Sequence, residues 1–146
     1  MDRNAQFERV QRMFHYGASK DADGMERTLK EIIEGCEDLA DLYGICYFFG
    51  VYGGKALREL HGKENETEGF FTIRPEELAG KDVGVVFAYR FVTACANDDP
   101  ETALALFNAA YEAPEEETGM SISALSAYVT NLATQVSDKK KAEAER

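Results

Sequence analysis

The feature that most constrains the fold is a twelve-residue stretch, YGICYFFGVYGG, at positions 43–54. It has five aromatic rings, four glycines and no charged side chain, with Asp41 before it and Lys55 after it. A helix that spans a membrane needs roughly 18 or more apolar residues in a row, so this stretch is too short. A helix that is apolar on nearly every side is usually buried on nearly every side. The sequence therefore predicts an internal helix in a protein that does not cross a membrane.

Helical periodicity divides this helix, expected over about residues 37–60, into two apolar stripes. The first recurs at heptad spacing and is expected to face the chain's own core. Its members are Leu39, Leu42, Cys46, Phe49, Gly53, Ala56 and Leu60. The second stripe, Ile45, Phe48 and Tyr52, lies well away from the first, and either other helices of the chain or a partner chain must cover it. Gly44 and Gly50 would let a second backbone approach, and each costs a helix ~1 kcal/mol relative to alanine.

The rest of the chain also shows helical periodicity, so we expect an all-α single domain of about six helices. Helix starts are indicated by a capping box at Asp23 and Glu26, by Asp82, and by Asp99 followed by Pro100. The first helix has Phe7, Val10 and Phe14 on its apolar face. The expected helices span about residues 4–18, 23–36, 37–60, 82–97, 100–112 and 120–137.

Residues 61–81 are expected to connect the two halves of this domain. HGKENETEG at 61–69 has no apolar side chain and is typical of an exposed loop. FFTI at 70–73 is either a strand or an extended anchor, and Pro75 suits the first turn of a brief helix. The charged tail, 138–146, is expected to fray, so that the domain ends near residue 137.

The two halves, about 4–60 and 82–137, resemble each other, which predicts two similar three-helix units. A shift of 78 residues aligns their first two helices, and a shift of 83 aligns their third helices. The aligned pairs include Met13 with Phe91, Asp21 with Asp99, Leu29 with Phe107, Leu42 with Leu125, and Cys46 with Val129.

The charge distribution indicates the class of partner. The formal net charge is −11, and no basic residue lies between Arg90 and Lys139. Nucleic-acid binding needs clustered lysine and arginine, so neither nucleic acid nor an anionic membrane is an expected partner. A basic protein suits this surface better. The predicted acidic contact residues are Asp98, Asp99, Glu101, Glu115, Glu116 and Glu117.

The sequence predicts no catalytic, cofactor-binding or metal-binding residue. SKDADGMERTLK has the aspartates of a calcium loop, but Ser19 occupies its first ligand position and Lys30 occupies the position that needs a bidentate glutamate, which favours a capped turn. Gly50, Gly53 and Gly54 lack dinucleotide-binding spacing, and no zinc-ligand cluster occurs. A cysteine–histidine nucleophile assembled only in the fold stays open. The N-terminus has no secretion signal and the three cysteines form no C-x-x-C pair, so a cytoplasmic location is expected.

The segment FVTACANDDPETALALF, at 91–107, resembles helical-hairpin repeats of the tetratricopeptide type in its small-residue spacing. The two-halved pattern with its acidic turn also looks like small helical proteins of unknown function from actinobacteria and their phages. The resemblance implies a helical, cytosolic and non-catalytic chain of phage or mobile-element origin.

These observations favour a non-enzymatic protein-interaction or regulatory module that self-associates, with a dimer as the first expectation. The predicted interface residues are Gly44, Ile45, Tyr47, Phe48, Gly50 and Tyr52. One alternative is a small-molecule binder or enzyme with a pocket between the halves, lined by Tyr43, Tyr47, Phe48 and Tyr52. Another is an acidic mimic of nucleic acid that occupies a basic site on an enzyme.

Overall fold

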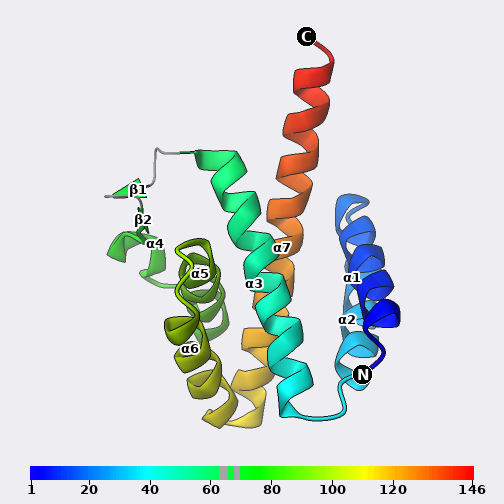
Figure 1. Cartoon of the computed structure of the whole chain (residues 1–146), viewed down its shortest axis with the longest axis vertical. Coiled ribbons are helices and arrows are strands. Elements are labelled where there is room, and N and C mark those ends of the chain that lie inside the picture. The colour runs from blue at the N-terminus through cyan, green and yellow to red at the C-terminus, as the bar shows by residue number, and fades with distance from the viewer. Residues whose placement is uncertain (63–65, 68–69) are drawn as a thin grey trace.

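The computed structural model describes residues 1–62, 66–67 and 70–146 (Figure 1). It confirms the all-α prediction, with seven helices in the described residues where about six were expected, the seventh being the predicted brief one. The helices are α1 Arg3–Ala18, α2 Ala22–Glu34, α3 Leu39–His61, α4 Pro75–Leu78, α5 Val83–Ala96, α6 Pro100–Glu112 and α7 Glu115–Ala144. Two short strands, β1 Glu66–Thr67 and β2 Phe70–Phe71, pair antiparallel between α3 and α4.

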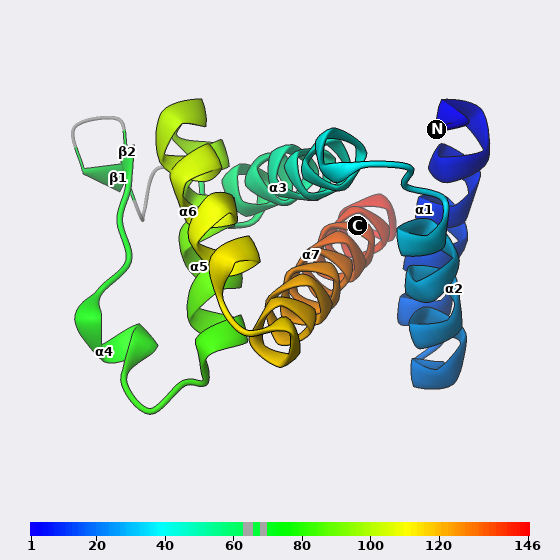
Figure 2. The ribbon, with the colours of Figure 1, turned by 90° about the horizontal axis from the view of Figure 1, so that it is seen from below.

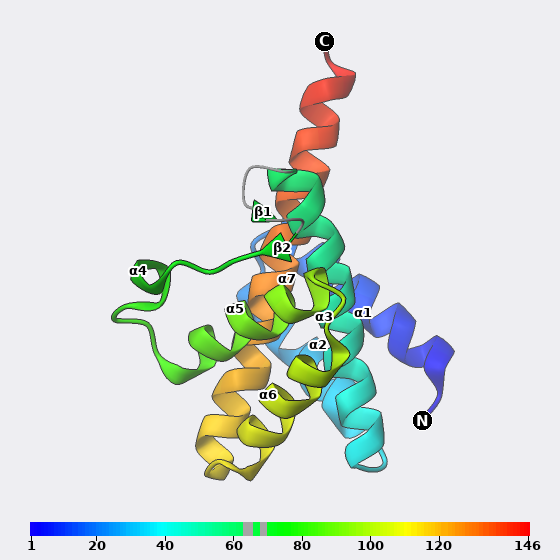
Figure 3. The same ribbon diagram turned by 60° about the vertical axis from the view of Figure 1, so that its left-hand side comes forward.

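The helices form three layers. The two long helices α3 and α7 lie side by side in the centre, the α1–α2 hairpin covers one side, and the α5–α6 hairpin covers the other (Figure 2). The largest fully buried side chains, Phe49, Phe91, Met13, Ile32 and Leu125, come from five helices and form one core. The C-terminal end of α7 extends beyond the other helices (Figure 3).

The second helix begins earlier than the sequence indicated. Asp21, and not Asp23, is the N-cap, because its Oδ1 accepts a hydrogen bond from the backbone N–H of Gly24 at 2.9 Å. Asp23 lies inside the first turn, where its negative charge is favourable beside the helix N-terminus. The predicted caps Asp82 and Asp99 are confirmed, each accepting from the backbone N–H three residues later.

The last helix is longer at both ends than predicted. α7 begins at Glu115, so the acidic segment expected to be a turn forms its first helical turn. It continues to Ala144, so the charged tail, which was expected to fray, is helical over most of its length. Lys139 Nζ donates a hydrogen bond to the backbone oxygen of Glu59 at 2.7 Å, which ties the tail to the end of α3.

The connecting segment combines both predicted roles of FFTI. Residues 63–65 and 68–69 of the predicted loop lie outside the described residues, and β2 forms within FFTI. Phe71 is 4% exposed, and the side-chain amide of Asn97 holds its backbone. Phe71 N–H donates to Asn97 Oδ1 at 2.6 Å, and Asn97 Nδ2 donates to Phe71 O at 2.8 Å. The strand is therefore also an anchor onto the C-terminal end of α5.

The hairpin turns of the two halves have the same geometry at the predicted shift of 78 residues. Lys20 and Asp98 are the non-glycine residues with positive φ in the described chain, at 59° and 54°. The residue after each is the helix cap, and its N–H bonds to a carbonyl five residues earlier, at 2.8 Å for Asp21 and 2.9 Å for Asp99. Left-handed backbone is uncommon outside glycine, so a matched pair supports the predicted repeat.

One buried hydroxyl in the core offers a stability test. Thr130, on α7, is 2% exposed, and its Oγ1 has no hydrogen-bond partner within the described part of the chain. An unpaired buried polar group is unfavourable, so Thr130→Val should raise the free energy of unfolding by about 1 kcal/mol. Thr28 is the matched control, since it is 3% exposed and its hydroxyl donates to Gly24 O at 2.7 Å. Thr28→Val should lower that free energy by about 1 kcal/mol in urea denaturation. Destabilisation by both variants would contradict the prediction.

Candidate interaction site

Four aromatic side chains form a continuous row across α1 and α3, and we call it the aromatic row. Phe7 and Phe14 come from one face of α1, and Phe48 and Tyr52 from one face of α3. Ring centroids are 6.3 Å apart for Phe7 and Phe48, 6.4 Å for Phe48 and Tyr52, and 4.9 Å for Phe14 and Tyr52. Phe7 is 51% exposed and Tyr52 is 41% exposed. The row therefore presents apolar rings to solvent as well as to one another.

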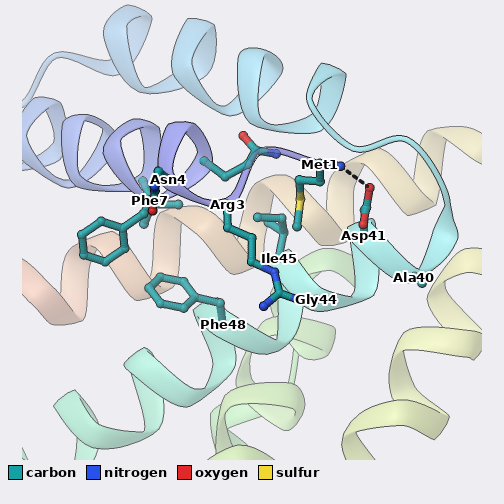
Figure 4. A pocket seen from close by; sticks show the side chains of 11 residues that line it. Met1, Arg3, Asn4, Phe7, Ala40, Asp41, Gly44, Ile45 and Phe48 are labelled. Carbon is teal, nitrogen blue, oxygen red and sulfur yellow. Dashed lines mark ion pairs between the residues drawn. The ribbon is translucent and has the colours of Figure 1, made fainter.

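A groove of about 800 Å³ adjoins the row, between the N-terminal halves of α1 and α3 (Figure 4). The buried side chains of Val10 and Ile45 line it, as do Phe7 and Phe48 of the aromatic row. Gly44 also lines the groove, and a Cβ atom built on it would have no neighbour within 4 Å. A Cβ atom at this position would therefore enter the groove without meeting the protein.

Charged groups surround the end of the groove where both helices begin. The Met1 amine pairs with the carboxylates of Glu37 at 3.3 Å and Asp41 at 3.8 Å, and these carboxylates raise the pKa of the amine, with the Glu37 hydrogen bond as the largest cause. Asp2 and Asp38 cap α1 and α3 at the same end. The Arg3 side chain extends toward Gly44 in Figure 4.

The two halves differ in how closely the first helix of each packs on the neighbouring long helix. In the second half, α5 packs closely on α7, and a Cβ atom at Gly84 would lie 2.6 Å from the backbone oxygen of Met120. The position 78 residues earlier is Gln6, which is 3% exposed and whose Nε2 donates to Ile32 O on α2 at 2.8 Å. α1 packs on α2 and α7 and stands off from α3, where only side chains bridge the gap.

The structure separates the predicted interface residues. Phe48 and Tyr52 lie in the aromatic row and Gly44 lines the groove, but Ile45 is 6% exposed and belongs to the chain's own core. Gly50 is also a core residue, since a Cβ atom there would lie 2.7 Å from the Phe91 ring on α5. Gly50 therefore packs against α5, and Ile45 is buried although it also lines the groove.

The four aromatic residues predicted to line a pocket between the halves lie on different sides of α3. Tyr43 lies on the opposite side of α3 from the aromatic row, with its ring 5.1 Å from Phe107 of α6 and 5.8 Å from Tyr47. Burial raises the pKa of the Tyr43 hydroxyl above its ordinary value. Only Phe48, of these four residues, lines the groove.

The acidic residues do not form one surface either. Asp98, Asp99 and Glu101 lie where α6 begins, and Glu115 to Glu117 follow its other end. α6 has thirteen residues, so the two groups are separated by about 20 Å along its axis at 1.5 Å per residue. Asp99 is engaged as a cap, and its hydrogen bonds with Thr102 lower the pKa of its carboxyl group.

The other side chains give little support for chemistry. Burial raises the pKa of both the Cys46 and the Cys95 thiol to about 12, which keeps them protonated at neutral pH. Within the described residues, no group of three or more histidine, cysteine or acidic side chains is placed to hold a metal ion. None of the described helices combines the length and the apolar character needed to cross a membrane.

No protein-family model matches the chain, and comparison with curated proteins and with solved structures finds no match either. The functional argument therefore rests on the geometry of the aromatic row and the groove. Phe7 and Phe14 belong to this site and were missed from the sequence, where their spacing indicated the core face of the first helix. Their exposure depends on how far α1 stands from α3, which helical periodicity does not encode.

Proposed function

We propose that the chain is a non-enzymatic protein-interaction module whose contact surface is the aromatic row with the adjoining groove. The observation that carries this proposal is the exposure of Phe7 and Tyr52 beside a groove with an apolar floor. Contiguous exposed apolar patches mark interaction sites, and aromatic side chains supply much of the binding energy at interfaces. The cytoplasm is the proposed location, which accords with three free cysteines.

Self-association as a dimer is the form of this function that the row supports directly. In a twofold dimer the same patch meets itself, so the aromatic row of one copy would pack on the row of the other. The acidic-mimic alternative has less support, because its carboxylates are divided between the two ends of α6.

Light scattering after size exclusion tests this proposal. The wild-type chain should elute with twice the 16.2 kDa of one chain, and Phe7→Asp should elute with the mass of one chain. A carboxylate at the Phe7 end of the row would have to be desolvated in the dimer, which is unfavourable without a partner charge. Tyr111→Asp is the matched control, because Tyr111 is 49% exposed on α6, away from the row.

Circular dichroism should show the same helix content in all three proteins, since both substituted side chains are about half exposed. A wild-type mass of one chain at every concentration would refute the dimer. A Phe7→Asp mass equal to that of a wild-type dimer would refute the aromatic row as its interface.

A further inference from the structure

We propose that a second cavity, bounded by the end of α3, by α5 and α7, and by the segment from β2 to α5, binds a small organic ammonium ion. This inference goes beyond the proposed function, because the cavity lies on the α5 side of the two central helices and the aromatic row lies on the α1 side (Figure 2). The cavity lies between the two halves of the domain, but its lining includes none of the four aromatic residues predicted for such a pocket.

The cavity has the size and the interior of a small-molecule site. Its volume is about 480 Å³, within the range of roughly 300–1,000 Å³ that is common for ligand pockets. Leu57 of α3, Tyr89 of α5 and Tyr128 of α7 supply apolar surface. The two tyrosine rings have their centroids 4.7 Å apart and are tilted by 49°. Burial raises the pKa of the Tyr128 hydroxyl to about 12, so this ring carries no charge at neutral pH.

The outer wall of the cavity, formed by β2 and α4, is held by contacts on the rest of the chain. Phe71 is 4% exposed, and the Arg58 guanidinium lies 5.4 Å from the centroid of its ring. Asn97 exchanges two hydrogen bonds with the backbone of Phe71. Glu77 Oε2 accepts a hydrogen bond from the backbone N–H of Arg74 at 3.3 Å, at the start of α4. A site whose wall is ordered before binding loses less conformational entropy when a ligand enters.

The charged groups of the lining are two carboxylates and one ammonium. The carboxylates belong to Glu76 and Glu77, and the ammonium belongs to Lys81. Two negative charges against one positive leave a net negative charge, with His61, which also lines the cavity, neutral. Within the described residues neither glutamate forms an ion pair, with Lys81 or with any other side chain. A cation that enters the cavity therefore meets carboxylates that have no partner in this part of the chain.

An ammonium group on an apolar stem matches these features together. The Glu77 carboxylate is near enough to Tyr128 to contribute to the raised pKa of its hydroxyl, so a negative charge and an aromatic ring border the same space. Ring faces and carboxylates both attract an ammonium ion, while the stem is removed from water against Leu57 and the rings. An anion would gain only Lys81 and would be repelled by the glutamates. The net charge of −11 adds attraction for a cation at long range.

Phenylethylamine is the probe, because it is an ammonium ion at neutral pH and its ring matches the apolar surface. Phenylethanol has nearly the same size without the charge, and phenylpropanoate has the opposite charge. Titration of isotope-labelled protein followed by NMR measures each affinity and locates the site from the backbone amides that shift. We expect shifts centred on Thr93 and Tyr128, which line the cavity. The alcohol and the anion should bind at least about tenfold more weakly than the amine.

Removing the two carboxylates tests the cavity itself. Glu76→Gln combined with Glu77→Gln preserves side-chain size, and both side chains are exposed, so the fold should be kept. Glu26→Gln combined with Glu34→Gln is the matched control, because it removes the same charge from exposed positions on α2, far from the cavity (Figure 2). The amine should bind the control as it binds the wild type, and the cavity variant at least about tenfold more weakly. The affinity of the alcohol should be the same for all three proteins.

Four results would overturn the inference. Equal affinity of the amine and the alcohol would mean that the cavity does not recognise an ammonium ion. Equal weakening in the two double variants would mean that only the overall charge attracts the probe. Absence of binding, or shifts centred on the aromatic row, would refute this cavity as the site. Tighter binding of phenylalanine, which adds a carboxylate to the same amine, would mean that Lys81 recruits a zwitterion. The mass of Phe7→Asp decides the proposed function separately, because Phe7 does not line this cavity.

Discussion

Gly54→Leu should lower the free energy of unfolding by about 4 kcal/mol or more, the largest effect expected from a single substitution in α3. A Cβ atom at Gly54 would lie 2.9 Å from both the backbone nitrogen and the Cα of Ala96 on α5. A backbone cannot rotate away as the end of a side chain can, so α3 and α5 would have to separate. Because Phe49 and Phe91 pack in the same core, that separation would also open their contacts.

Gly44→Leu provides the internal comparison for this prediction. It is the same substitution in the same helix, but the Cβ position of Gly44 is open, so we expect stabilisation of up to ~1 kcal/mol from helix propensity alone. Urea denaturation followed by circular dichroism measures both variants. Similar effects in the two variants would mean that close approach of α5 is not why residue 54 is glycine.

The contrast between Gly44 and Gly50 shows what helical periodicity does not predict. Gly44 and Gly50 both lie in the aromatic stretch at 43–54, and both were predicted to admit a partner's backbone. Burial of Gly50 is decided by Cys95 and Phe91 on α5, forty residues or more along the chain. Helical periodicity gives the direction of each position around α3, but not which helix of the tertiary structure meets it.

The sequence predicted the second apolar stripe but left open what covers it. Ile45 is buried, Phe48 is partly buried and Tyr52 is 41% exposed, so the exposure of the stripe rises along α3. That gradient depends on the position of α1, which Gln6 and the α2 contacts determine. The sequence therefore predicts the apolar surface but not the groove beside it.

Helix ends were predictable where a single side chain decides them. Asp82 and Asp99 cap α5 and α6 as expected, and at α6 Pro100 marks the first helical position, which selects Asp99 over the neighbouring Asp98. Asp21 and Asp23 compete, and the left-handed turn at Lys20 favours the earlier one. At the start of α7, Pro114 and Gly119 suggested a longer turn, yet three glutamates in the first turn favour a helix through its dipole.

The rate at which the thiols are labelled tests whether the protein has a cysteine nucleophile. The expected reduction of this rate is the second largest effect that we predict. Cys46 is fully buried, and burial raises the pKa of both the Cys46 and the Cys95 thiol from 9.0 to about 12. A thiol with a pKa of about 12 has ~1000-fold less thiolate near neutral pH than one of ordinary pKa, and the higher nucleophilicity of a more basic thiolate recovers ~30-fold of this. Cys95 should therefore react about 30-fold more slowly than a free thiol with iodoacetamide, and Cys46 should react more slowly still, at the rate of unfolding.

Mass spectrometry of labelled peptides separates the three cysteines. Cys36 is partly exposed, and although burial raises its pKa, that pKa is not raised as far as those of Cys46 and Cys95, so Cys36 should be labelled first. The raised pKa of Cys95 fixes the sign of the pH dependence: its labelling rate should still rise between pH 9.0 and about 12, where the rate of an ordinary thiol has levelled. In denaturant all three should react alike. Fast labelling of Cys95 in the native protein at neutral pH would mean that something activates this thiol, and the enzyme alternative would then take precedence over a passive interaction module.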